Sequence, residues 1–218
     1  MSHRPLRVAV LISGTGSNLK TLIDAARSRR LNIEICQVIS NRSEAPGLDH
    51  ARDADIETGV IAGSDRGAQD RAIARCLDGK EVELVVLAGY MSILGARLVA
   101  RYTGRMINLH PSLLPLYPGL DTYRRALAAG DREHGASIHF VTSELDSGPV
   151  ISQVRIPVLP GDTARELAAR LGPREHDLLR ATVELFTERR VEMHSTAVVL
   201  DGRRLTQPLL LNEQNRFD

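Results

Sequence analysis

Short apolar runs alternate with longer amphipathic stretches along most of the chain. The apolar runs lack regularly spaced polar positions, which is typical of strands that are covered by helices on both faces of a sheet. Apolar positions in the longer stretches recur at the spacing of one face of an α-helix. The pattern predicts an α/β fold with a Rossmann-like, mostly parallel, twisted sheet and helices on both of its faces.

The boundaries of the elements follow from these two periodicities. Strands are expected at residues 6–12, 33–39, 60–62, 83–89, 105–109, 136–142 and 149–158, and helices at residues 17–30, 44–53, 67–77, 96–101, 122–129 and 163–189. The apolar run at 83–89 predicts a buried strand with parallel neighbours. Because proline lacks an N–H group and clashes one turn back, Gly172-Pro173 predicts a kink or break in the last helix. The segment 198–205 around Asp201-Gly202 predicts a hairpin that ends an antiparallel C-terminal part.

Composition limits the classes of function. With 218 residues, 43% of them hydrophobic and 25% charged, the chain is long enough for one large domain, and no linker or repeat divides it. A net charge of +1 shows no basic excess, so nucleic acid is not an expected partner. No signal-peptide pattern precedes the first strand, and no apolar stretch is long enough to span a membrane. We therefore expect a cytoplasmic protein that neither enters a membrane nor binds nucleic acid.

The two cysteines, Cys36 and Cys76, lie in apolar segments. They lack CxxC spacing and nearby histidine ligands, which argues against a metal site and against a disulfide. A buried, reduced thiol is expected at each position, as in a reducing cytoplasm.

A glycine-rich segment, Ser13-Gly14-Thr15-Gly16-Ser17-Asn18, follows the first predicted strand directly. Glycine allows a tight turn, and the free amides at the start of the next helix bind anions with the help of the helix dipole. The segment therefore predicts a phosphate site. The alternative is a glycine-rich turn in which Ser17 or Asn18 caps the helix and no ligand binds.

A dinucleotide site is a competing interpretation of this segment. Leu19 replaces the third glycine of the G-x-G-x-x-G pattern, and the second strand ends in Ser40-Asn41-Arg42, without an acid for a ribose hydroxyl. NAD is therefore disfavoured. Arg42 leaves NADP open, because an arginine there suits a 2′-phosphate.

Asn108, His110 and Asp146 form a second set of polar residues. Asn108 and His110 are two positions apart at the end of a predicted strand, where ligands of open α/β sheets bind, and they face the same side while the chain stays extended. An amide, an imidazole and a carboxylate together polarise a carbonyl, stabilise the oxyanion and manage the departing proton, so the trio predicts an acyl-transfer site. Taken singly, each is equally well explained as a structural residue. His139 alternates with apolar residues and is either structural or a partner behind the trio.

Several longer motifs resemble one known family. They are Ser-Gly-Thr-Gly-Ser-Asn-Leu at 13–19, Leu-Ala-Gly-Tyr-Met at 87–91, Asn-Leu-His-Pro-Ser-Leu-Leu-Pro at 108–115, Tyr-Pro-Gly-Leu at 117–120, Glu-Leu-Asp-Ser-Gly-Pro-Val-Ile at 144–151 and Arg-Glu-His at 174–176. In this order, over nearly the whole chain, they resemble the phosphoribosylglycinamide formyltransferases of purine synthesis. The resemblance implies a single domain with the formyltransferase fold. It also implies transfer of a formyl group from the co-substrate 10-formyltetrahydrofolate to the amine of glycinamide ribonucleotide, without a metal.

The resemblance assigns phosphate binding to residues 1–101, and folate binding and catalysis to residues 102–218. It places the ribonucleotide at Gly16, Ser17, Asn18, Gly172, Pro173, Arg174 and Glu175, with the Glu175 carboxylate at the amine end. It places the folate at Arg66, Met91, Ser92, Ile93, Leu94, Asn108, Thr142, Ser143, Glu144, Leu145 and Asp146. The partners implied are these small molecules, and the protein is expected to be a monomer or homodimer.

The resemblance makes Asn108, His110 and Asp146 catalytic, with Asn108 over the formyl group, His110 donating to the oxyanion and His139 behind them. Because a neighbouring carboxylate favours imidazolium, Asp146 is expected to raise the pKa of His110 and keep it charged near neutral pH.

The chain also departs from the family's usual motifs. Ser92 stands where an arginine is frequent, and Asp121 and Tyr123 stand where a Leu-His-Thr-His form is common. The folate pocket is therefore expected to differ in detail, while the reaction class is unaffected.

Two alternatives stay open. A formyltetrahydrofolate hydrolase uses similar Asn, His and Asp residues with water as the acceptor, but it carries an extra N-terminal domain for which this sequence has no room. A non-catalytic sensor of nucleotide phosphates would have no need for the intact trio.

Overall fold

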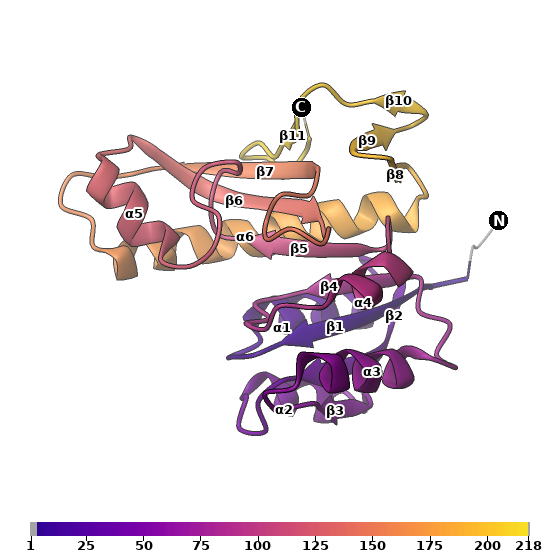
Figure 1. Cartoon of the computed structure of the whole chain (residues 1–218). Coiled ribbons are helices and arrows are strands. Elements are labelled where there is room, and N and C mark those ends of the chain that lie inside the picture. Colours follow the sequence, from indigo (N-terminus) through magenta and orange to yellow (C-terminus); the bar gives the residue numbers. More distant parts are fainter. Residues whose placement is uncertain (1–3, 218) are drawn as a thin grey trace.

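The computed structural model describes residues 4–217, and strands alternate with helices through most of the chain (Figure 1). The strands are β1 (Leu6–Ile12), β2 (Ile33–Ser40), β3 (Thr58–Val60), β4 (Leu84–Leu87), β5 (Met106–His110), β6 (Glu133–Phe140), β7 (Val150–Pro157), β8 (Val191–His194), β9 (Ala197–Leu200), β10 (Arg203–Arg204) and β11 (Leu209–Leu210). The helices are α1 (Ser17–Arg27), α2 (Gly47–Arg52), α3 (Arg66–Leu77), α4 (Ala96–Arg101), α5 (Thr122–Ala129) and α6 (Ala164–Thr187).

Eight strands form the central sheet, in the order β11-β7-β6-β5-β4-β1-β2-β3. β3, β2, β1, β4 and β5 are neighbours in this order and pair in parallel. β5, β6 and β7 pair antiparallel. After β1, the chain forms β2 on one side of β1 and later returns to form β4 on the other side of β1. Open α/β sheets bind ligands at such a switch point, outside the carboxyl ends of the strands. The expected fold class is confirmed.

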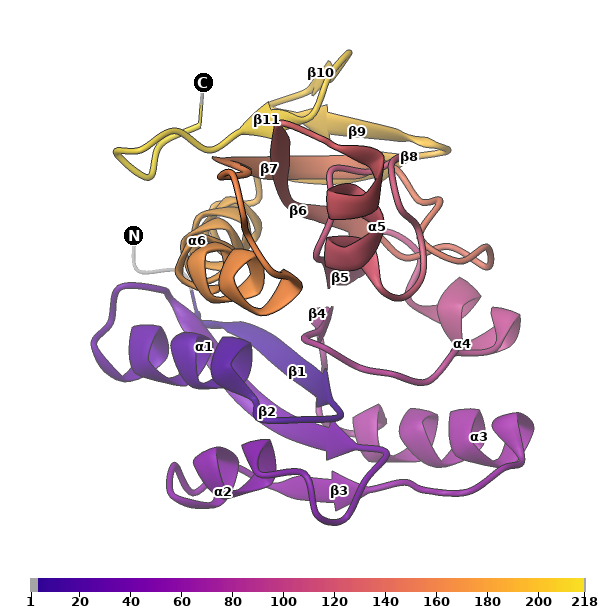
Figure 2. The same ribbon diagram turned by 90° about the vertical axis from the view of Figure 1, so that its left-hand side faces the viewer.

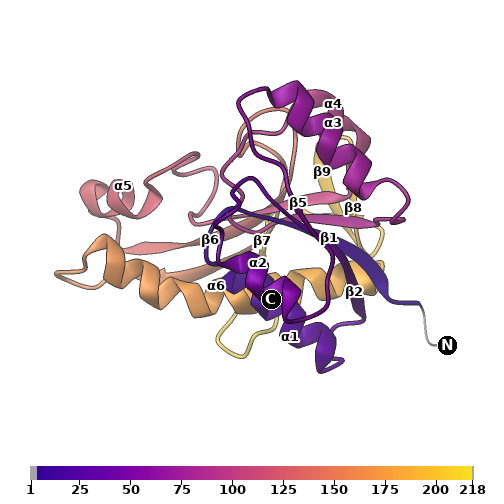
Figure 3. The ribbon, with the colours of Figure 1, turned by 90° about the horizontal axis from the view of Figure 1, so that it is seen from below.

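Helices cover both faces of this sheet (Figures 2 and 3). On one face, α1, α2 and α6 contribute Leu22, Leu48 and Leu179 to a large buried cluster. On the other face, α3 and α4 contribute Ile73 and Leu98 to a second cluster. The strands between the two layers are apolar on both sides, which explains why they showed no polar alternation in the sequence.

Of the kink or break expected at Gly172-Pro173, the break is absent from the structure. α6 continues through Pro173 as a single helix and packs along the sheet beside β6 and β7 (Figure 1). Leu167 and Leu171 before the proline, and Leu178 and Leu179 after it, are fully buried. Burial of both segments against one sheet stabilises the helix by more than the lost N–H bond and the clash cost it.

The hairpin expected around Asp201-Gly202 was confirmed. β9 and β10 pair antiparallel, and both turn residues have positive φ. The sequence did not predict β8, which pairs with β9 in a separate three-stranded sheet, or β11, which extends the central sheet. These strands are too short to give a clear periodic signal.

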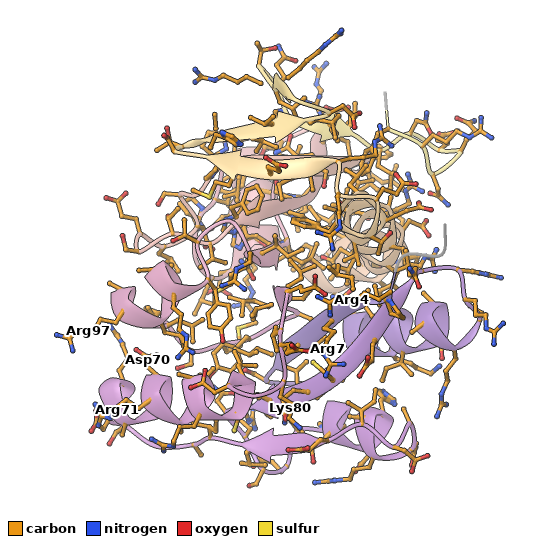
Figure 4. The ribbon with its side chains drawn as sticks, turned by 90° about the vertical axis from the view of Figure 1, so that its right-hand side faces the viewer. Arg4, Arg7, Asp70, Arg71, Lys80 and Arg97 are labelled. Carbon is orange, nitrogen blue, oxygen red and sulfur yellow. The ribbon has the colours of Figure 1, made fainter. Side chains whose placement is uncertain are left out.

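Charged side chains gather at two places on the side of the molecule that Figure 4 shows. Arg4, Arg7 and Lys80 lie near the start of β1, where Arg7 pairs with Glu34 and donates to the Lys80 carbonyl. Asp70 belongs to α3 and points toward α4, where its carboxylate accepts from the Gly95 amide at 2.9 Å. These contacts join β1 to β2 and join α3 to the residue that precedes α4.

Cys36 and Cys76 are free thiols, as expected, but both are only half-buried. No helix in residues 4–217 is long and apolar enough to cross a bilayer.

Candidate active site

The glycine-rich segment leads from β1 into α1, and its backbone conformation depends on Gly16. Gly16 has φ 73°, and a Cβ added there would lie 2.5 Å from the Cα of Gly47. The position therefore requires glycine for two reasons, a left-handed backbone and a close approach to α2. Thr15 and Ser17 are exposed on either side, no side chain of the described residues caps the helix, and the first amides of α1 have no partner within the helix.

Ser13 ties this segment to two neighbouring loops. Its hydroxyl donates to Asn41 Oδ1 after β2 and accepts from the Met91 amide after β4, at 2.6 and 2.7 Å. The loops on both sides of the switch point are thus held together. The sequence analysis missed this role, because the signal is a single serine without a spacing pattern.

Asn108 and His139 meet across the antiparallel pair β5 and β6, where they are direct register partners. The Asn108 amide nitrogen lies 3.1 Å from His139 Nε2 and 3.4 Å from Asp146 Oδ1. His139 Nδ1 lies 2.9 Å from the Phe140 carbonyl, which only accepts, so Nδ1 carries the proton and Nε2 accepts from Asn108. Asn108, His139 and Asp146 therefore form one network.

His110 joins this network through Asp146. Its Nδ1 lies 3.4 Å from Asp146 Oδ2, and its Nε2 donates to the Tyr117 carbonyl at 2.9 Å. Both side chains are nearly buried, with side-chain exposures of 7% and 8%. The structure thus brings together the three residues that the sequence analysis singled out, with His139 behind them.

The expectation that His110 has a raised pKa was wrong. Burial lowers the pKa of His110, and although the Tyr117 carbonyl and the Asp146 charge act in the opposite direction, the net shift is downward. Burial also raises the pKa of Asp146, but the neighbouring His139 ring, the hydrogen bond from the Gly119 amide and nearby His110 together bring it below the ordinary value. The resting pair is therefore neutral imidazole and carboxylate.

Two turns place Asp146 in this position. Asp146 has φ 49°, and its Oδ2 accepts from the Gly119 amide at 2.8 Å. A Cβ at Gly148 would lie 1.8 Å from the Phe140 carbonyl, so only glycine allows the β6–β7 loop to close against the end of β6. Asp146 is thus held by loops from two separate parts of the chain.

A buried polar network supports the loop that follows His110. The Ser137 hydroxyl donates to the Ser112 carbonyl at 2.6 Å and accepts from the Leu114 amide at 3.0 Å. Gln153 Nε2 donates to the Leu114 carbonyl and to Ser137, both at 2.9 Å. Satisfied buried networks hold a backbone in one arrangement. The sequence analysis missed Ser137 and Gln153, because nothing in their strand marks them as loop supports.

Exposed apolar side chains cluster on the loops around this network. Met91 and Ile93 follow β4, Leu116 and Leu120 follow β5, and Leu145 precedes Asp146. Met91 and Leu120 are 68% and 74% exposed. Within the described part of the chain, these five residues account for most of the large exposed apolar side chains. Apolar surface of this kind marks a place where a ligand or partner binds.

The other residues predicted for folate binding lie on these same loops or beside them. Leu94 is buried, and the Ser92 hydroxyl lies 3.5 Å from Gln69 on α3. Arg66 begins α3 and lies beside Gly95. Thr142, Ser143 and Glu144 belong to the β6–β7 loop, with Ser143 and Glu144 exposed.

The residues predicted for the ribonucleotide separate into two groups. Glu175 on α6 accepts hydrogen bonds from the Asn18 side chain and from the Tyr123 hydroxyl, the latter at 3.3 Å. Burial raises the pKa of Glu175 to about 7, and these two hydrogen bonds oppose the shift.

Arg174 turns away to Asp177, Asn212 and Asn215, so it anchors the C-terminal segment. Gly172 has open space at its Cβ position, and Pro173 is exposed.

Asn18 retains an unused acceptor. Among the described residues, its buried Oδ1 has no hydrogen-bond partner. A buried polar atom of this kind is uncommon in folded proteins and suits a donor group on a ligand. No group of three His, Cys, Asp or Glu side chains in residues 4–217 is arranged to hold a metal ion.

Comparisons with known proteins agree with this geometry. The sequence pattern of the formyl transferase family matches residues 6–183. The phosphoribosylglycinamide formyltransferase of Escherichia coli K12 is 45% identical over 203 residues, which cover 92% of this chain and 96% of the relative. A solved phosphoribosylglycinamide formyltransferase from Coxiella burnetii is 45% identical, with a TM-score of 0.88 over 93% of this chain and 96% of that one.

The hydrolase alternative is a more distant neighbour. A solved formyltetrahydrofolate deformylase from Pseudomonas syringae pv. tomato is 29% identical, with a TM-score of 0.85. The match covers 90% of this chain but only 66% of the deformylase. Sequence and structure therefore agree on the family, and the full-length matches favour its formyltransferase branch. The chain belongs to the formyl transferase family.

Proposed function

We propose that this protein is a phosphoribosylglycinamide formyltransferase of de novo purine biosynthesis. It transfers the formyl group of 10-formyltetrahydrofolate to the amine of 5′-phosphoribosylglycinamide, giving formylglycinamide ribonucleotide and tetrahydrofolate. The observation that carries the proposal is the side-chain network of Asn108, His110 and Asp146 in a chain that matches such enzymes over nearly its full length. Its partners in this role are small molecules.

The ribonucleotide site extends from α1 to α6. The backbone amides at the start of α1, at Gly16, Ser17 and Asn18, suit the 5′-phosphate because they combine donors that the helix does not use with the positive end of the helix dipole. Glu175 and the unused Asn18 Oδ1 suit the N–H groups of the glycinamide. The contacts of Arg174 support an indirect role, in which it holds the segment that covers α6.

The folate site lies on the opposite side of the Asn108 network. The apolar residues Met91, Ile93 and Leu145 suit the planar ring system, which needs a surface that excludes water. Exposed backbone in the β6–β7 loop from Thr142 to Asp146 suits hydrogen bonding to the ring edge, and Arg66 suits the carboxylates of the tail. Ribonucleotide and folate contacts thus occur in both halves of the chain, with the phosphate contacts in residues 1–101.

The proposed reaction starts with attack of the substrate amine on the formyl carbon. A C–N bond forms, and the carbonyl electron pair moves to oxygen. Asn108 and His110 donate hydrogen bonds to this oxyanion, and Asp146 accepts the proton that leaves the nitrogen. The oxyanion's electron pair then re-forms the carbonyl as the bond to folate N10 breaks, the electron pair of that bond goes to N10, and N10 takes up the proton that Asp146 accepted, which completes tetrahydrofolate.

The neutral resting state of His110 sets a condition on this reaction. Its Nε2–H is engaged by the Tyr117 carbonyl, and its unprotonated Nδ1 faces Asp146. A proton released by the substrate fits between Nδ1 and Asp146 Oδ2, where both atoms are acceptors. Protonation at this point makes His110 an imidazolium whose Nδ1–H stays with Asp146, so its Nε2–H has to leave the Tyr117 carbonyl in order to donate to the oxyanion.

The test uses purified protein with 10-formyltetrahydrofolate, with and without 5′-phosphoribosylglycinamide, following folate absorbance and the formylated product. We expect deformylation only in the presence of the ribonucleotide, with one product formed for each folate consumed. Rapid deformylation in water alone would identify a hydrolase. Binding of the ribonucleotide without turnover would identify a phosphate sensor.

A further inference from the structure

Tyr123 connects the two sides of the site. It lies in the first turn of α5, and its hydroxyl donates to Glu175 Oε1 on α6 at 3.3 Å. Its ring packs against His134 of β6, with ring centroids 5.1 Å apart and an interplanar angle of 59°. His134 hydrogen-bonds to the backbone of Pro111, the residue after His110. A continuous series of contacts thus runs from the ribonucleotide side to the catalytic loop.

The protonation states of the pair follow from their surroundings. Burial, and then the neighbouring Glu175, raise the pKa of Tyr123 far above its ordinary value, so the hydroxyl stays a donor. The carboxyl group of Glu175 has a pKa near neutral pH, because burial raises the pKa to about 7 although hydrogen bonds from Tyr123 and Asn18 oppose that shift. Loss of either donor therefore moves Glu175 toward the protonated form.

Within the described part of the chain, no cation assists the Glu175 carboxylate. From α1 it is faced by Asn18, and from α5 by Tyr123 with His134 of β6 behind the ring. On α6 itself, Arg174 pairs with Asp177, and His176 is influenced by Arg180 and Asp177. The charge of Glu175 is thus stabilised by two neutral donors alone.

We propose that Tyr123 is a positioning residue for the substrate amine, whose hydroxyl holds Glu175 as a carboxylate turned toward the glycinamide N–H groups. This inference rests on the proposed function. A carboxylate accepts hydrogen bonds with both oxygens, whereas a protonated Glu175 would direct an O–H toward the amine. Tyr123 thereby sets the lower limit of the pH range in which the ribonucleotide binds productively.

The test compares the wild type with Tyr123→Phe, which removes the hydroxyl and keeps the ring on His134. The pH dependence of kcat/KM for the ribonucleotide is measured. We expect the acid limb of the kcat/KM profile to move to higher pH by roughly one unit in the variant. Below that limb, kcat/KM should then be about tenfold lower than in the wild type. The loss should disappear above about pH 9, where Glu175 is ionised in both proteins. The KM for folate should not change, and the substrate's own titration cancels in the comparison.

Two further variants separate this role from packing. Tyr123→His places an N–H donor at the same position and should return the acid limb toward the wild-type value. Tyr102→Phe removes a phenolic hydroxyl from a ring that packs against the Arg105 guanidinium, directly after α4, and should leave the profile unchanged. A loss in Tyr123→Phe that is equal at every pH, or an unmoved acid limb, would overturn the proposal.

Carboxyl-carbon NMR of the free protein gives a readout that does not depend on turnover. Glu175 is assigned by its absence in Glu175→Gln, and its titration should move to higher pH in Tyr123→Phe. An unmoved titration would refute the Tyr123 role. Absence of ribonucleotide-dependent transfer in the wild type would refute the proposed function instead and would leave the titration result standing.

Discussion

The two sides of the site are built by different means. On the proposed ribonucleotide side, the expected donors are backbone amides at the start of α1, and Gly16 allows the chain to turn there and to contact Gly47. On the proposed catalytic side, the groups are the side chains of Asn108, His110, His139 and Asp146, of which Asn108 is half-buried and the other three are nearly buried. The first depends on local backbone conformation, whereas the second depends on the pairing of distant strands.

This difference decides what a substitution does on each side. A residue that shapes a backbone site acts mainly through the fold, because the donors belong to the main chain. A residue in a side-chain network acts through protonation and hydrogen bonding, because the supporting loops are held by other residues such as Ser137 and Gln153. Stability should therefore respond most to changes at Gly16, and activity to changes at Asp146.

The largest effect is expected for Asp146→Asn, which keeps the shape of the side chain and removes its charge. Turnover should fall by about 10² to 10⁴, the usual contribution of a positioned acid or base. The Asp146 charge opposes the effect of burial on His110, so the pKa of His110 should fall further in the variant. Kinetics gives the first quantity, and NMR titration of the His110 ring gives the second.

An exposed pair provides the control for this change. His194 and Glu192 lie 2.9 Å apart on β8, but both are more than half exposed, so water screens their interaction. Glu192→Gln should leave turnover unaltered. Identical His110 titrations in the wild type and in Asp146→Asn would exclude the electrostatic role and leave Asp146 as a proton acceptor only.

The next effect is on stability, in the comparison of Gly16→Ala with Gly14→Ala. Alanine at Gly16 meets both a left-handed backbone and the Cα of Gly47, so unfolding should become easier by roughly 2 to 5 kcal/mol. Gly14 has nothing within 4 Å of its Cβ position, so its variant should stay within about 0.5 kcal/mol of the wild type. Urea unfolding measures both. Equal stabilities would show that the backbone conformation of the segment does not depend on Gly16.

The smallest effect is expected for Glu175→Gln and depends on pH. Since burial raises the pKa of Glu175 from 4.5 to about 7, the protonated form favours folding, and this stability is lost as pH rises between those values. Glutamine resembles the protonated form. The variant should match the wild type near about pH 4.5 and exceed it by roughly 1 to 2 kcal/mol near about pH 8.5, after allowance for partial exposure.

Urea unfolding at both pH values tests this expectation, and the same difference at each pH would show that burial does not perturb Glu175. A gain in stability together with a loss of ribonucleotide affinity would place Glu175 among residues that function retains at a cost to the fold.

Most elements of the fold could be predicted from the sequence. β1, α4 and α5 match the expected boundaries, because an apolar run or an amphipathic stretch with a clear end defines each of them. The errors have physical causes. The expected break at Pro173 ignored the burial of α6 on both sides of the proline. Short strands such as β8 and β11 carry too few residues for periodicity and form only because neighbouring strands offer an edge.

The candidate site was only partly accessible from the sequence. Asn108 and His110 were identified because they are close in sequence at the end of a strand. The placement of Asn108 opposite His139 depends on an antiparallel strand register that no local sequence pattern specifies. The sign of the His110 pKa shift depends on competition between burial and the Asp146 charge, and burial is known only when the surrounding loops are in place.

The sequence by itself determined the α/β class, the glycine-rich turn after β1 and the residue types needed for acyl transfer, because all three follow from local periodicity and side-chain chemistry. Only the tertiary structure decided that Gly16 contacts Gly47, that Ser13 joins two loops, and that Tyr123 and Asn18 share Glu175. Each of these contacts joins segments that are far apart in the chain. Their distances, and the balance of charge and burial that results, exist only after the layers have packed.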